Sequence, residues 1–107
     1  MPQTYKLRIP DDVAVLVRGT HPLLKNKIKA SLRIILSEPG SGKALKNELA
    51  GLRSFRVSRF RIIYRIRSEV IEIVAIGPRE RIYEETFLML NKRVAMEISP
   101  SRVNFAL

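Results

Sequence analysis

The sequence predicts an α+β fold, in which helices and strands occupy separate stretches of the chain. Three observations carry this prediction. Apolar residues recur at helical spacing between residues 22 and 37, arginines alternate with apolar residues between 59 and 67, and a second strand-like run follows the short turn Ser68–Glu69. The length of 107 residues suits one domain. We expect it to span residues 1–107, with a C-terminal helix and tail from about residue 84.

The N-terminal third is predicted to form a strand and two helices. Residues 3–9 alternate in polarity and indicate an edge or starting strand. Pro10 and two aspartates then open a short helix, because acidic residues are favoured in a first helical turn. A break at residues 20–22 separates this helix from a second, which runs to about Ser37. Its buried stripe is predicted to be Leu24, Ile28, Leu32, Ile35 and Leu36.

Strands are predicted over 53–58, 59–67 and 70–77, after a loop at 38–42, and a third helix over about 84–96. A hairpin turn at Ser68–Glu69 fixes the expected cross-strand pairs. They are Tyr64 with Ile73, Ile66 with Ile71, Ile62 with Ala75, Arg65 with Glu72, and Arg61 with Ile76. This register gives Arg65 an ion-pair partner and leaves Arg61 without one.

Arginines dominate the predicted sheet. Eight lie between residues 53 and 81, opposed there by three glutamates, and the whole chain carries a net charge of +10. Because successive side chains of a strand point to opposite faces, the alternation predicts one apolar face and one cationic face. A cationic face of this kind suits a polyanion such as nucleic acid.

The composition excludes several kinds of chemistry. The chain has no cysteine and one histidine, His21, which we interpret as a cap or surface residue. Thiolate and histidine metal sites, and catalysis by two histidines, are therefore not expected, and no metal or other cofactor is predicted. No run of about 18 apolar residues is present, so no membrane span is expected. Binding to a membrane surface is disfavoured because the charges cluster on strand-like stretches instead of along one amphipathic basic helix. A cytoplasmic location is the default expectation.

Three segments together resemble the RelE/ParE superfamily of toxins from prokaryotic toxin–antitoxin modules. They are ILSEPGSGKALKNELAG at 35–51, GLRSFRVSRFRIIYRI at 51–66 and IEIVAIGPRERIYE at 71–84. The resemblance implies two N-terminal helices packed on a small, twisted, mostly antiparallel sheet of about four strands, plus a C-terminal helix. It also implies an endoribonuclease that cuts messenger RNA in the ribosomal A site, without metal, and so represses translation. The ribose 2′-hydroxyl would be the nucleophile.

The resemblance also assigns roles to residues. It implies that Arg61 stabilises the phosphorane, that Arg79 lies near the leaving oxygen, and that Tyr83 stacks on a base or orients the hydroxyl. These three are the predicted catalytic residues. The predicted RNA- or phosphate-binding residues are Arg56, Arg59, Arg81, Lys43 and Lys46.

The sequence departs from the RelE pattern at three positions. Leu52 and Ser54 stand where many RelE-type nucleases carry basic residues, one of them the favoured general base, and Pro78 replaces a histidine or lysine. A lysine at 43 or 46, or Tyr83, could take the role of the base. Two alternatives therefore stay open. One is a ParE-like toxin that inhibits DNA gyrase without cleavage, and the other is an inactive nucleic-acid-binding module.

A partner is implied in either toxin case. The resemblance predicts an acidic cognate antitoxin, encoded by a neighbouring gene, that forms a hetero-oligomer with this chain. Its disordered segment would fold on the basic surface, neutralising the arginines, displacing the third helix, or both.

Overall fold

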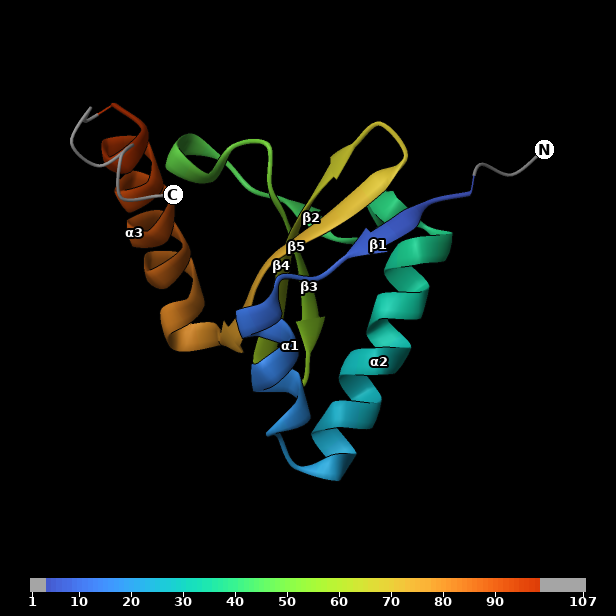
Figure 1. The fold of residues 1–107 in the computed structure, drawn as a ribbon. Helices are drawn as coiled ribbons and strands as arrows, with labels where there is room; N and C mark the ends of the chain where they lie inside the picture. Colours follow the sequence, from blue (N-terminus) through green and yellow to red (C-terminus); the bar gives the residue numbers. More distant parts are fainter. Residues whose placement is uncertain (1–3, 99–107) are drawn as a thin grey trace.

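The computed structural model describes residues 4–98 and shows an open five-stranded sheet with helices on both faces (Figure 1). No helix within those residues is long and apolar enough to cross a membrane. The main elements are β1 (Lys6–Arg8), α1 (Asp11–Arg18), α2 (Pro22–Ser37), β2 (Lys43–Ala44), β3 (Arg53–Val57), β4 (Phe60–Arg67), β5 (Val70–Pro78) and α3 (Arg79–Ile98). Two single-turn 3₁₀ helices, η1 (Pro39–Ser41) and η2 (Asn47–Leu49), complete the connections.

The predicted α+β fold is confirmed, as are both N-terminal helices and the three long strands. The strand order is β1-β5-β4-β3-β2, and β1 pairs with β5 in parallel while the other pairs are antiparallel. The expected count of about four strands becomes five because β2, only two residues long, pairs with the start of β3.

The hairpin register was predicted correctly for half of its length. Tyr64 pairs with Ile73 and Arg65 with Glu72, but a bulge next to Tyr64 places Val74 as an extra residue in β5. Beyond the bulge the predicted pairs are wrong by one residue. Ile62 faces Ile76 instead of Ala75, and Arg61 faces Gly77 instead of Ile76.

The first apolar core lies between the sheet and helices α1 and α2. Its centre is Tyr64, Ile62 and Ile73 from the sheet, which contact Ile28 and Ile35 from α2. All five members of the predicted α2 stripe take part, since Ile28, Leu32 and Ile35 are buried and Leu24 and Leu36 pack at the rim. Helical spacing was therefore a reliable guide to this face.

The second face of the sheet is not purely cationic, which corrects the sequence prediction. Ile63 and Val74 point to this face and form a smaller core with Leu52 and with Ile82 of α3. Alternation from Ile73 already places Val74 on this face, and the bulge then moves Ala75 to the same face and Ile76 to the first core. Figure 1 shows α3 on the opposite side of the strands from α2. Arginines therefore occupy the two ends of this face, and α3 covers its middle.

Helix α3 begins at Arg79, five residues earlier than predicted, and follows β5 without a loop. The close approach of helix and strand depends on Gly77, where an added Cβ would lie 2.8 Å from Cδ1 of Ile82. Tyr83, expected at a strand–helix junction, is thus inside the helix. The part of the predicted C-terminal tail from residue 99 onwards lies outside the described residues.

Hydrogen bonds from side chains of two strands, β3 and β4, hold the loop at 38–42 against the sheet. The Tyr64 hydroxyl, inside the first core, donates to the Pro39 carbonyl at 2.7 Å and accepts from the Gly42 amide at 2.9 Å. Arg53 donates to the Gly42 carbonyl at 2.8 Å. These contacts set the path of the chain into β2, and so the position of Lys43 beside β3.

Candidate functional site

Two arginines lie directly opposite each other at one end of the second sheet face. Arg56 of β3 and Arg61 of β4 are register partners, so their side chains leave the sheet on the same side. We call them the arginine pair. The Nε atom of Arg61 is buried and has no hydrogen-bond partner among the described residues. Arg56 has only a long contact, 3.4 Å, from Nε to the Ser58 carbonyl.

The arginine pair is electrostatically unfavourable without a ligand. Like charges directly opposite on neighbouring strands repel, and a buried N–H without an acceptor costs about 1–3 kcal/mol. The ion pairs formed among the described residues all use Glu72, at the other end of β4. An anionic oxygen placed between the accessible ends of the two guanidinium groups would relieve the repulsion.

Two further predicted site residues are brought to the same end of the sheet. Arg59 lies in the β3–β4 turn, and its carbonyl accepts a 2.8 Å hydrogen bond from the backbone amide of Arg79. The side chains of Arg59, Arg79 and Arg81 are exposed. Because α3 starts at Arg79, the positive end of the helix dipole adds to the charge here. The possible ion pairs of Arg79 or Arg81 with Glu80 do not form in the structure.

Tyr83 reaches across from α3 to the middle of β3. Its hydroxyl lies 3.0 Å from the hydroxyl of Ser54, and either oxygen can be the donor. We call these two groups the hydroxyl pair. Ser54 is only 2% exposed and lies two residues before Arg56, so about 7 Å along the same face separates it from the arginine pair. Lys43 is the register partner of Ser54, and it is exposed, as is Lys46.

The structure therefore gathers most of the predicted site, and it adds one residue. Sequence reasoning treated Ser54 as a position that lacks a basic side chain. In the structure Ser54 is buried and holds the Tyr83 hydroxyl. The signal that could have revealed it is the strand period of two, which puts Ser54 on the same face as Arg56.

The described residues offer neither a free histidine nor a cluster of metal ligands. His21 is the N-cap of α2 and accepts a 3.1 Å hydrogen bond from the Leu23 amide, which confirms its interpretation as a cap. Residues 4–98 contain no group of three histidine, cysteine or carboxylate side chains arranged to hold a metal ion. The functional groups on hand are guanidinium ions, two lysines and a pair of hydroxyls, which suit the recognition of phosphodiester oxygens.

This fold and this arginine-rich sheet define the class of small RelE/ParE-type toxins. The model of the family "ParE toxin of type II toxin–antitoxin system, parDE" matches residues 8–83, well over half of the chain. The protein therefore belongs to this family. None of the curated proteins is similar enough in sequence to count as a relative.

Solved structures of similar fold come from the same group of modules. The RelBE2 toxin–antitoxin complex from Mycobacterium tuberculosis contains a chain with 25% identity and a TM-score of 0.63, over 74% of this chain and 95% of that one. A mutant Escherichia coli RelE toxin in the free state gives 17% identity and a TM-score of 0.66, over 86% and 99%. The archaeal RelE–RelB complex from Pyrococcus horikoshii OT3 gives 24% and 0.61, over 74% and 99%.

Proposed function

We propose that the protein is a toxin that cleaves messenger RNA on the ribosome, using the ribose 2′-hydroxyl as nucleophile. The observation that carries this proposal is the arginine pair, which presents two guanidinium groups without a carboxylate partner on the same sheet face as the hydroxyl pair. A single strand of RNA supplies phosphate oxygens whose negative charge would offset that of the arginine pair. The resemblance of the three sequence segments to the RelE branch favours the same target.

The reaction would need little beyond positioning and charge. The 2′-oxygen attacks phosphorus, the bond from phosphorus to the 5′-oxygen breaks, and the products are a 2′,3′-cyclic phosphate and a 5′-hydroxyl. Arg61, with Arg56, would stabilise the extra negative charge of the phosphorane, an effect that is typically worth about 100- to 1,000-fold in rate for one donor. Arg79 would contact the leaving 5′-oxygen as a phosphate clamp, and that oxygen would take its proton from water, since a guanidinium group hardly gives up its own.

The proton of the 2′-hydroxyl needs an acceptor, and guanidinium groups cannot supply one. Three groups near β3 are candidates, namely Tyr83 of the hydroxyl pair and the exposed Lys43 and Lys46. Tyr83 is the one whose orientation is fixed by a hydrogen bond. Arg59 and Arg81, both exposed at the same end of the sheet, would bind flanking phosphates.

Growth arrest and mapping of RNA 5′-ends in cells test the proposal. Wild-type protein should arrest growth and create new 5′-ends inside translated messages. Arg61→Gln and Arg79→Gln should slow cleavage by about 100-fold, whereas Arg33→Gln, which removes an exposed charge from α2, should act like wild type. Full cleavage by both site variants would contradict the site assignment.

A second candidate is a toxin that inhibits DNA gyrase by binding alone. The observation that favours it concerns Leu52 and Ser54, which stand where nucleolytic relatives often have basic residues. Both are buried, at 5% and 2% exposed, so neither position offers a basic group to a substrate. A gyrase supercoiling assay separates the candidates. Inhibition of supercoiling without new RNA ends would establish the binding toxin, and neither effect would indicate an inactive nucleic-acid-binding module.

An acidic antitoxin is the proposed partner in both cases. The support is the net charge of +10 and the occurrence of relatives in toxin–antitoxin complexes. Such a partner would form a hetero-oligomer with this chain in the cytoplasm. Co-expression with the neighbouring gene product should restore growth and yield a stable complex, and failure of any neighbour to do so would contradict this part of the proposal.

A further inference from the structure

A second arginine group lies at the other end of β4, on the same face as the arginine pair. Arg8 of β1 is the register partner of Glu72 on β5, and Glu72 is in turn the partner of Arg65 on β4. One carboxylate oxygen of Glu72, Oε1, accepts from Nε of Arg65 at 3.1 Å and lies 3.4 Å from Nε of Arg67. Arg65 and Arg67 thus share one carboxylate, and with Arg8 close by in the register the group carries a local excess of two positive charges.

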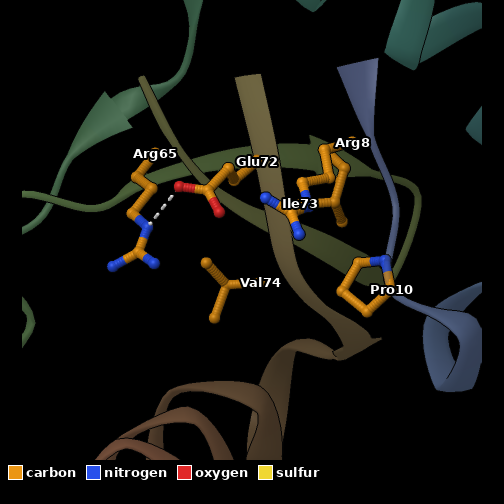
Figure 2. Close-up of a pocket in the computed structure, with 6 residues that line it drawn as sticks. All are labelled: Arg8, Pro10, Arg65, Glu72, Ile73 and Val74. Carbon is orange, nitrogen blue, oxygen red and sulfur yellow. Dashed lines mark hydrogen bonds and ion pairs between the residues drawn. The ribbon is translucent and has the colours of Figure 1, made fainter. Parts of the chain in front are cut away.

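These residues border a cavity of about 290 Å³. Figure 2 shows the side chains of Arg8 and Arg65 on either side of the Glu72 carboxylate, with Val74 and Pro10 along the apolar wall. The Glu72 side chain is 18% exposed and that of Arg65 is 28% exposed, so the charges are partly shielded from water. Shielding strengthens their interaction with any anion that enters.

The cavity has donors to spare. A guanidinium group carries five N–H donors, and Arg65 uses only its Nε on Glu72. The guanidinium group of Arg8 makes no hydrogen bond to any residue in the described part of the chain. Glu72 therefore holds the guanidinium group of Arg65 in place, while the remaining N–H donors of Arg65 and those of Arg8 stay available to a ligand.

We propose that this cavity binds a side-chain carboxylate of an acidic protein partner. A single carboxylate of a Glu or Asp side chain fits the cavity and pairs with the free edges of Arg8 and Arg65. Glu72 repels a phosphodiester and a carboxylate alike, so the choice between the two ligands depends on how each could reach the cavity.

The position of α3 supports the same choice. Ile63 lies midway between Arg61 and Arg65 on the second face, and it is buried under α3. A nucleic-acid strand on the arginine pair would have to cross the helix to reach the cavity. The inference rests on the part of the proposed function that gives this toxin an acidic partner, and it is independent of RNA cleavage.

Two labelled probes test the proposal on the full chain at low ionic strength, a capped hexaglutamate peptide and a hexauridylate RNA. The Arg8→Gln and Arg65→Gln variants should each bind the peptide about tenfold more weakly, the usual loss for a charge-assisted hydrogen bond. Arg33→Gln removes the same charge elsewhere and should leave peptide affinity within about twofold of wild type. RNA affinity should fall for Arg56→Gln and not for Arg8→Gln.

NMR chemical shifts of residues that line the cavity test the proposal without any substitution. In NMR titrations of the unmodified protein, the backbone amide signals of Ile73 and Val74 should shift with the peptide and stay in place with the RNA. Three results would overturn the proposal. The first is that the wild-type protein does not bind the peptide. The second is an equal loss of peptide affinity in all four variants, which would indicate a nonspecific charge effect. The third is a shift of the Val74 signal with RNA, which would make the cavity a nucleic-acid subsite.

Discussion

Replacement of Tyr64 by phenylalanine removes one oxygen atom from the core and should destabilise the protein strongly. The hydroxyl serves the Gly42 amide and the Pro39 carbonyl at 2.9 and 2.7 Å. Gly42 is buried, so its amide would lose its acceptor without gaining water, at a cost of about 1–3 kcal/mol. Pro39 is partly exposed, and its carbonyl should cost nearer to 1 kcal/mol. The sum is about 2–4 kcal/mol, a large fraction of the stability of a typical domain.

Urea unfolding followed by circular dichroism measures this effect. The midpoint should fall while the slope stays constant, because the surface exposed on unfolding is unchanged. Tyr83→Phe is the matched control, since it removes a hydroxyl that has one partner instead of two. It leaves the buried Ser54 hydroxyl without that partner and should cost about 1–3 kcal/mol, with no effect on the Gly42 amide. Hydrogen exchange of the Gly42 amide should accelerate in Tyr64→Phe. A loss below about 1 kcal/mol with the Gly42 amide still protected would refute this account of the loop.

Three further predictions address the second face. Gly77→Ala should lower the free energy of unfolding by about 1–3 kcal/mol, because the new methyl group would lie 2.8 Å from Cδ1 of the buried Ile82, and an unchanged thermal midpoint would show that helix and sheet can separate freely. Arg65→Gln should cost at most about 1 kcal/mol, because Glu72 keeps Arg67, and urea unfolding would reveal any larger loss as a hidden structural role. Arg61→Gln should reduce the slope of log affinity for single-stranded RNA against log salt concentration by about 0.7, and an unchanged slope would mean that no phosphate contacts this residue.

The sequence was most informative where one periodicity held over a whole element. The α2 stripe and the central arginines on β4 followed from spacing alone, because each side chain repeats its environment at a fixed interval. The hairpin register was correct from the turn as far as Tyr64. It then failed at Val74, since nothing in a run of apolar residues marks which one is the bulge. The start of α3 was missed because Pro78 and Arg79 suggested an exit from the sheet, whereas the helix begins at once.

The candidate site was predictable to a similar degree. The arginine pair lies within one hairpin, so strand periodicity was enough to place Arg61 on the exposed face. The contact between Ser54 and Tyr83 joins residues that are far apart in sequence, and it depends on how α3 crosses the sheet. The angle at which α3 crosses the sheet cannot be predicted from the residue pattern of either element alone. The roles of these residues in catalysis stay predictions until the variants are assayed.

Because β5 passes directly into α3, the strand and the start of the helix are expected to move as one rigid unit. Hinges need a few backbone residues whose dihedral angles can change, and none separates Pro78 from Arg79. The first turns of α3 must therefore move together with the last residues of β5. A small tilt of that strand, even one caused by a substitution deep in the core, would be magnified along the helix and would carry the Tyr83 oxygen away from Ser54.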